Sequence, residues 1–163
     1  MSTPKVTMDV NMTRLNAAIK AFVSVHGPNA ADKIVRKASF DVIYRITTSL
    51  NGLHGTIKRI DTGRYRAGWN LALVAATGQK AGPTSGGNAE NPQKATDGQG
   101  KVAGKGLLRR AELRNNVEYG PYIEYGTATM APGQHVTLAL EYVAKVVEDV
   151  AKQAVIDAAR GRL

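Results

Sequence analysis

The stretch "LLRRAELRNNVEY", residues 107–119, decides which fold class the sequence predicts. Between 107 and 117, most odd-numbered positions are apolar: Leu107, Ala111, Leu113 and Val117. The even-numbered positions include the charged Arg110, Glu112 and Arg114. A period of two residues is typical of a β-strand, here one with a strongly solvated face. Because the segments flanking this region read as helices, the sequence predicts a small α+β domain spanning 1–163.

A partner strand is predicted over 68–77, where Trp69, Leu71 and Leu73 alternate with other residues. Between the two strands, residues 78–106 contain eight glycines, two prolines and no aromatic residue. That composition buries too little apolar surface to offset the entropy of ordering it. We therefore expect a glycine-rich mobile loop at 78–106, joining two antiparallel strands as a long flexible hairpin.

Three amphipathic helices are expected around this sheet, because apolar residues recur at helical spacing. Their expected bounds are from near 11–13 to the Gly27–Pro28 stop signal, from after Asn29 to Asn51–Gly52, and from near Gln134 to near Arg160. In the first of them, Leu15, Ile19 and Phe22 form the apolar stripe. The predicted fold is thus a small antiparallel sheet packed with two N-terminal helices and a long C-terminal helix.

Composition limits the chemistry that this chain can perform. Its 163 residues include no cysteine, so disulfides, thiolate nucleophiles and sulfur-bound zinc are excluded. The net charge of +9 favours contact with polyanions such as nucleic acid or anionic lipid. No apolar run approaches the length of a membrane span, and residues 1–14 lack a signal-peptide core, so we expect neither membrane insertion nor export.

The sequence shows no complete catalytic motif. We therefore expect that the chain is not an enzyme and that it binds neither a cofactor nor a metal ion. "GQGKVAGKG", residues 98–106, has the wrong glycine spacing for a phosphate-binding loop and places Gly106 where a hydroxyl is needed. His26, His54 and His135 are scattered, and none sits in a nucleophile elbow. We interpret them as solvated or helix-capping residues.

The densest cluster of unusual residues is "VEYGPYIEYGTATMAPG", residues 117–133. Glu118 and Glu124 could be interpreted as an acid–base pair, but no third group accompanies them, and structural roles are favoured. We expect a rigid corner between the second strand and the last helix, in which Glu124 must find a cation or backbone donors. Arg64, which follows the turn residues Asp61 and Gly63, is a candidate partner for Glu124.

Two segments resemble a known family, the neck and tail-completion proteins of tailed bacteriophages. The first is Asp-Thr-Gly at 61–63 followed by "RYRAGW", and the second is the Tyr-rich Glu-aromatic-Gly-Thr element followed by Met130, Pro132 and a helix. The resemblance points to structural or assembly roles for Asp61, Gly63, Arg64, Trp69, Tyr119, Tyr122, Glu124, Tyr125, Gly126 and Thr127.

The resemblance implies a structural virion protein, assembled in the host cytoplasm, that forms a six-fold or twelve-fold homo-oligomeric ring around the DNA channel between head and tail. Neighbouring neck, portal-adaptor or tail-tube proteins would be its partners, and contact with genomic double-stranded DNA would be weak and non-specific. Possible channel or inter-ring contacts are Lys80, Lys94, Lys101, Lys105, Arg109 and Arg110. The alternatives are a small basic protein that associates with DNA non-specifically and forms no ring and, less favoured, a phage nuclease or lysis accessory enzyme.

Overall fold

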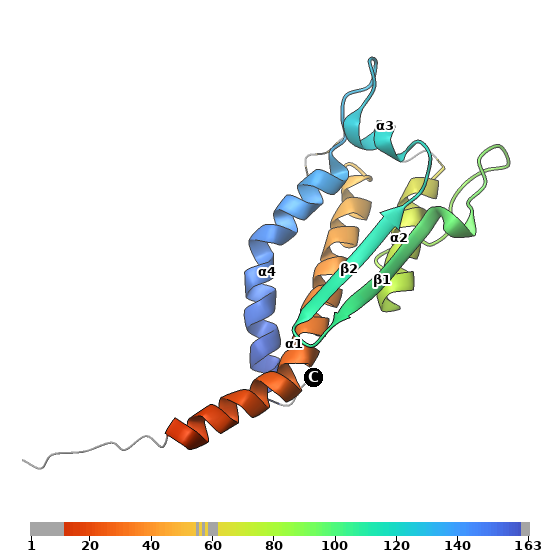
Figure 1. The fold of residues 1–163 in the computed structure, drawn as a ribbon. Coiled ribbons are helices and arrows are strands. Elements are labelled where there is room, and N and C mark those ends of the chain that lie inside the picture. The colour runs from red at the N-terminus through yellow and green to blue at the C-terminus, as the bar shows by residue number, and fades with distance from the viewer. Residues whose placement is uncertain (1–11, 55, 57, 59–61, 161–163) are drawn as a thin grey trace, which may run out of the picture.

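The computed structural model describes residues 12–54, 56, 58 and 62–160; for 12–23, 25, 26, 158 and 159 it describes the backbone only. The α+β class is confirmed: a two-stranded antiparallel hairpin packs with helices α1, α2 and a long C-terminal helix α4 (Figure 1). The elements are α1 Met12–Ser49, α2 Arg64–Thr77, a short 3-10 turn Ala95–Asp97, β1 Gly98–Lys105, β2 Leu108–Asn115, α3 Gly120–Tyr125 and α4 His135–Ala159.

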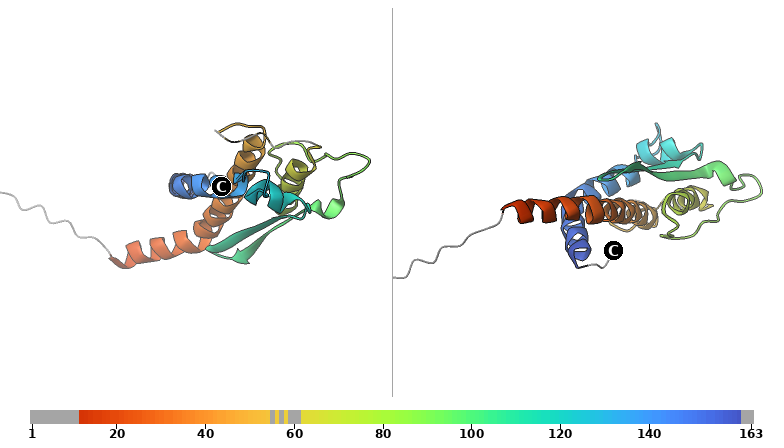
Figure 2. Two further views of the ribbon diagram at one scale, coloured as in Figure 1. Left: turned by 90° about the horizontal axis from the view of Figure 1, so that it is seen from above. Right: turned by 60° about the horizontal axis from the view of Figure 1, so that its bottom comes forward.

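The hairpin lies over the helices, as the two views of Figure 2 show. The register of β1 and β2 runs from Gly98 opposite Asn115 to Lys105 opposite Leu108. Helix α2 packs against both strands, and α1 packs chiefly against α4. One face of the hairpin is therefore covered by helices and the other is left to solvent.

The predicted helix end at Gly27–Pro28 is wrong, because α1 continues through Pro28 to Ser49. Proline removes one backbone donor and kinks a helix without having to end it, provided that packing compensates. Figure 1 shows that α1 bends between its red first part and its orange second part. Gly27 lies against the hairpin tip, where an added Cβ would come within 2.7 Å of the Leu107 side chain. The two predicted N-terminal helices are thus one bent helix.

The predicted strand at 68–77 is also wrong, since these residues belong to α2. The alternation at Trp69, Leu71 and Leu73 also fits a helix that is buried on several sides, and a short apolar run does not distinguish the two periods. Leucine and alanine are strong helix formers. Gly78, at φ 75°, ends the helix by donating its N–H to the Val74 carbonyl.

The true partner of β2 lies inside the segment expected to be a loop. Residues 78–94 are irregular, but Gly98–Lys105 form β1. Added Cβ atoms at Gly98 and Gly100 would overlap the backbone carbonyl oxygens of Gly68 and Ala72 on α2. The glycines that suggested disorder are therefore the positions at which a strand approaches a helix backbone closely.

The core lies where α1, α2, the corner after β2 and α4 meet. Its buried members are Ile43, Ile46, Leu50, Tyr65, Leu73, Val117, Ile123 and Ala139. The predicted C-terminal helix is confirmed with bounds close to those expected, and its ion pair of Glu148 with Lys152 forms at 3.0 Å. Residues 1–11 and 161–163 lie outside the described part of the chain.

Candidate functional site

Arg64, in the first of the two motif segments, is the centre of an ion-pair network that includes the buried Asp97 and reaches the exposed Glu118, which directly precedes the second segment. Arg64, in the first turn of α2, donates from Nε and Nη2 to the two carboxylate oxygens of Asp97, each at 2.7 Å. Both side chains are 2% exposed. Arg64 also bonds the side-chain oxygen of Asn91, and its Nη1 lies 3.0 Å from Glu118. This bidentate pair fixes the start of β1 to the start of α2.

The pKa values of the two carboxyls in this network are lowered. For Asp97 the main cause is its hydrogen bond from Arg64, which outweighs the opposing effect of burial. For Glu118, which is 61% exposed, its own backbone N–H and then Lys94 lower the pKa to about 2. Both groups are therefore ionised at neutral pH and hold the Arg64 guanidinium between them.

The hypothesis that Arg64 pairs with Glu124 is wrong. The Glu124 carboxylate accepts hydrogen bonds from the backbone N–H groups of Val136 and Thr137, each at 2.9 Å, and from the Thr137 hydroxyl at 2.8 Å. It thus satisfies backbone donors in the first turn of α4, where a negative charge also suits the helix dipole. The expectation that this 5% exposed carboxylate must find a cation or backbone donors is met by backbone donors.

The aromatic residues of the corner divide into two groups. Tyr119 packs on Tyr65, and Trp69 meets the Tyr65 ring edge-on, with ring centroids 6.4 Å and 6.1 Å apart. Burial raises the pKa of the Tyr65 phenol to about 12. Tyr122 and Tyr125, by contrast, are 58% and 76% exposed. The first group builds the core, and the second is presented to a partner or to solvent.

Three further predicted residues flank these contacts. Gly63 and Gly126 adopt φ values of 76° and 77°, the left-handed region that favours glycine. Thr127 is exposed, and its backbone N–H donates to the Met130 carbonyl at 2.8 Å. Asp61 lies outside the described residues. Gly63 therefore marks the start of α2, and Gly126 marks the end of α3.

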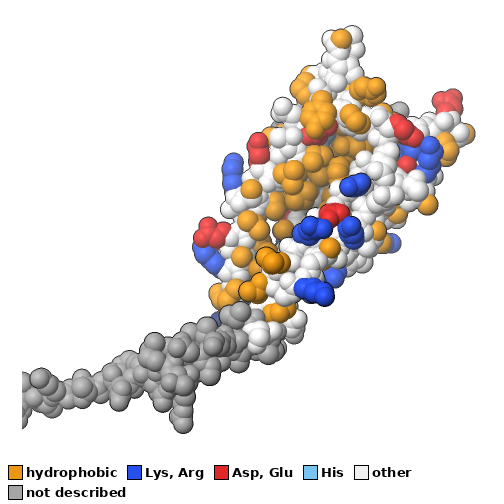
Figure 3. All heavy atoms as spheres, in the orientation of Figure 1, with side chains coloured by type: hydrophobic (Ala, Val, Ile, Leu, Met, Phe, Trp, Pro, Cys, Tyr) orange, Lys and Arg blue, Asp and Glu red, His pale blue; other side chains and the backbone are white. Residues whose placement is uncertain are grey.

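The solvent face of the hairpin is basic. Since Gly98 and Gly100 face α2, the alternate positions face away from it. These positions carry Lys101, Lys105, Arg110 and Arg114 against the single acid Glu112. Figure 3 shows this cluster of basic side chains on the hairpin, with one acidic group among them. We call these five residues the basic hairpin face.

Only part of the predicted basic set lies on this face. Arg109 points to the other side, where it donates to the Gly104 carbonyl at 2.9 Å and lies 3.9 Å from Asp32. Lys94 pairs with Glu118, and Lys80 is exposed on the irregular segment. Arg114 was not among the predicted contacts, although the strand alternation through 110, 112 and 114 contained the signal for it.

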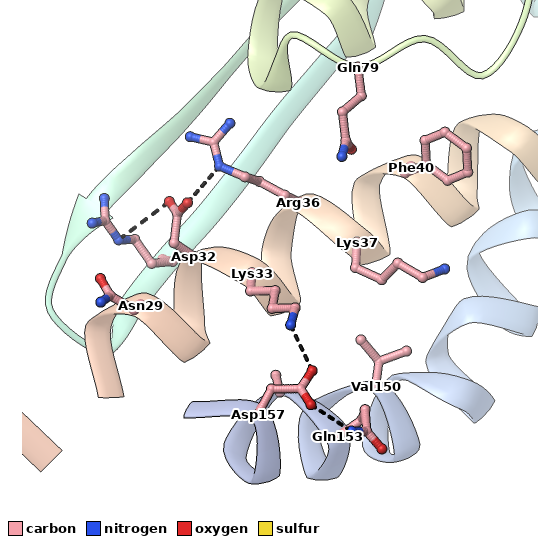
Figure 4. Close-up of a pocket in the computed structure, with 12 residues that line it drawn as sticks. Asn29, Asp32, Lys33, Arg36, Lys37, Phe40, Gln79, Val150, Gln153 and Asp157 are labelled. Carbon is pink, nitrogen blue, oxygen red and sulfur yellow. Dashed lines mark hydrogen bonds and ion pairs between the residues drawn. The ribbon is translucent and has the colours of Figure 1, made fainter. Parts of the chain in front are cut away.

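A groove of about 1110 Å³ lies between α1 and α4, on the side of Gln79 (Figure 4). Its basic side chains have acidic partners: Lys33 meets Asp157 at 2.7 Å, and Arg36 meets Asp32 at 2.6 Å. Because these charges are already neutralised, the groove offers little that would select a charged ligand. Of these two ion pairs, only that of Lys33 with Asp157 joins α1 to α4.

Two of the histidines are placed in detail. His135 is fully buried at the start of α4, with Nδ1 3.0 Å from the Ser49 hydroxyl. The same hydroxyl also lies 2.8 Å from the Ile46 carbonyl oxygen, so Ser49 links His135 to the end of α1. His54 Nε2 lies 3.0 Å from the Thr48 hydroxyl. His26 lies inside α1, not at a helix end, and only its backbone is described.

The described residues were also considered as a metal site and as membrane-spanning helices. No group of three or more His, Cys, Asp or Glu residues among them has the geometry to hold a metal ion. Within the same residues, none of the helices has both the length and the apolar character that crossing a membrane requires.

The fold is a small α+β domain in which Arg64 bonds Asp97 and Glu118, and Tyr65 packs against Tyr119. The chain matches no protein-family model, no curated protein and no solved structure. The residues and contacts of the chain itself are therefore the basis for its function.

Proposed function

We propose that this chain is a ring subunit of the neck of a tailed phage, a structural virion protein that connects the head to the tail and surrounds the DNA channel. The observation that carries the proposal is the junction of its two motif segments. The two motif segments, far apart in sequence, meet where Arg64 pairs with Glu118, the residue before Tyr119, and where the tilted rings of Tyr65 and Tyr119 pack together. These contacts hold the two segments in one arrangement. A ring subunit needs such a rigid shape in order to repeat the same contacts around the ring.

The basic hairpin face supports contact with the genome. It presents four cations and one anion on an open strand surface, and the anion is shared between Lys101 at 3.1 Å and Arg110 at 3.3 Å. Cations on a surface of this kind attract phosphates without reading base sequence. Weak, salt-sensitive contact would let DNA move through the channel. The other subunits of the ring and the adjoining portal-adaptor or tail-tube proteins are the proposed protein partners.

The proposal is tested by asking whether the chain is part of the particle. Mass spectrometry of gradient-purified virions should detect it in stoichiometric amounts, and particles lacking it should accumulate as unjoined heads and tails. A chain that is abundant in the infected cell but missing from purified virions would overturn the proposal.

The structure changes the deletion experiment that the sequence suggests. If the segment 80–103 were a peripheral loop, removing it would leave the fold intact and impair only the joining of heads to tails. It contains Asp97, which is bonded to Arg64, and most of β1, so we now expect this deletion to unfold the domain. Shortening only the exposed tip at 88–90 is the milder test of a role in joining.

The alternative is a small basic DNA-associated protein that forms no ring, and the same hairpin face favours it. DNA binding in a salt series separates the two functions. Sequence-selective binding that persists at high salt would overturn the structural proposal, because contacts to phosphates alone weaken steeply as salt rises.

A further inference from the structure

The first part of α1 and an apolar hollow on the body are the two features that the proposed function leaves unexplained. Figures 1 and 2 agree that the red part of α1 projects beyond the end of α4 and away from the rest of the chain. We call residues 12–26 the arm. Figure 3 shows hydrophobic side chains gathered in the hollow between α4 and the hairpin. We call this hollow the trough.

The helices beside the trough leave apolar positions only partly covered. Residues 35, 38 and 42 recur at helical spacing on α1, as do 136, 140 and 147 on α4, so each set shares one face of its helix. Leu140 is 53% exposed. The partly exposed set is Val35, Ala38, Val42, Val136, Leu140 and Val147.

The sequence of the arm suits such a trough. Its apolar positions 15, 19 and 22 fall on one helical face, a stripe about 10 Å long at 1.5 Å per residue. The α4 wall from 136 to 147 is about 16 Å long on the same rise, so the stripe fits within it. The charged residues of the arm lie at positions 14 and 20, outside its apolar positions. The length and the apolar character of the stripe therefore match those of the trough.

An arm does not reach the trough of its own chain. The arm and the α1 wall of the trough are parts of one continuous helix, and the arm points away from the body. Folding back would require breaking the helix near Pro28 and reversing its direction. The arm that fills a trough must come from a second copy.

We propose that the arm of each copy docks in the trough of the next copy. Because two different patches meet, the contact is heterologous, and repetition of it closes into a ring if the rotation between copies allows. The inference rests on the proposed ring function and assigns the contact by which the ring is built. It gives α1 two roles, since its second half packs in its own subunit and its arm reaches the neighbour.

The absence of cysteine from the sequence gives a direct test. One preparation carries Ile19→Cys, a second carries Leu140→Cys, and the two are mixed with a short bismaleimide, so a hetero-linked dimer reports contact between copies. The matched control is Leu138→Cys on the same helix, 40% exposed in the native protein but about 200° around the axis from position 140. Circular dichroism and urea titration show whether all three variants fold as the parent does.

Docking predicts that position 19 links to position 140 at least about tenfold more than to position 138, a difference of the size that one well-buried contact makes in an equilibrium. Equal linking to the two positions, or no link to position 140 at the highest soluble concentration, overturns the inference. If the linking fails while the chain is still found in purified virions, the docking inference alone is wrong. If the chain is missing from virions, the proposed function is wrong whatever the linking shows.

Discussion

Two regions of this molecule contain similar charged side chains and use them differently. In the Arg64–Asp97 network the side chains are 2% exposed and are joined by two hydrogen bonds of 2.7 Å. On the basic hairpin face, Lys101 and Glu112 lie 3.1 Å apart with side chains 64% and 37% exposed. The first pair is committed to holding the fold, and the second face remains available for a partner.

The difference shows that burial, more than residue type, separates structural from functional charges in this chain. A buried pair cannot lose one member without leaving an uncompensated charge in a dry site. An exposed pair loses little when it is broken, because water replaces the partner. Substitutions in the two regions should therefore differ in their effects, and the largest change is expected in the buried network.

Asp97→Asn should have the largest effect on stability. It leaves the Arg64 guanidinium buried without its bidentate carboxylate, and breaking such a pair costs about 3–5 kcal/mol. Urea unfolding followed by circular dichroism measures the change. The matched control, Glu112→Gln on the hairpin face, should change the free energy of unfolding by less than ~1 kcal/mol. Equal losses from the two variants would remove the distinction between the regions.

Glu124→Ala should cause the next largest loss, about 2 kcal/mol, since it removes a buried cap of the α4 N-terminus. Three donors, two of them backbone N–H groups, lose their acceptor. Glu141→Ala, on an exposed position of the same helix, is the control. Thermal unfolding compares them, and an unchanged midpoint for Glu124→Ala would show that water replaces the carboxylate.

Acid should weaken the Arg64–Asp97 network. The folded-state pKa of Asp97 lies below its ordinary value of 3.8, and that of Glu118 falls from 4.5 to about 2. Each group therefore stabilises the fold above its ordinary pKa and loses that contribution as the pH drops through the lowered value. The free energy of unfolding should fall below pH ~4, and Asp97→Asn should flatten this acid limb.

The smallest stability change is expected on the hairpin face. The double variant Arg110→Ala, Arg114→Ala should change the free energy of unfolding by only about 0.5 kcal/mol per site. It should nevertheless lower the salt dependence of DNA binding, by about 0.9 in the slope of log K against log salt for each phosphate that the protein no longer neutralises. Lys80→Ala, on the irregular segment, is the control. An unchanged slope in the double variant would show that the face does not meet phosphates.

The sequence predicted the elements whose patterns are local. The period-two pattern of 107–117 and the heptad-like stripe of the last helix predicted β2 and α4 nearly at their observed bounds. The glycine-rich segment misled because Gly98 and Gly100 are needed for contact with α2, a tertiary requirement that composition does not reveal. The alternation at Trp69 misled because a helix buried on several sides shows no clean period.

For the candidate site, the sequence predicted many of the residues but few of the contacts between them. The need of Glu124 for donors followed from a carboxylate in an apolar corner, but which donors it meets depends on where α4 starts. Asp97 was not predicted, because it looks like a turn residue in a flexible loop until β1 brings it beside Arg64. Contacts between residues far apart in sequence depend on the topology. Placing one strand at the wrong residues therefore predicts the wrong partners for these side chains.

The most direct test of the neck assignment is an electron-microscopy map of the intact neck of the virion. The assignment predicts a ring whose subunits fit this fold, with the basic hairpin face turned toward the DNA channel. A neck map with no density for this fold, or a ring whose hairpin faces point away from the channel, would contradict it.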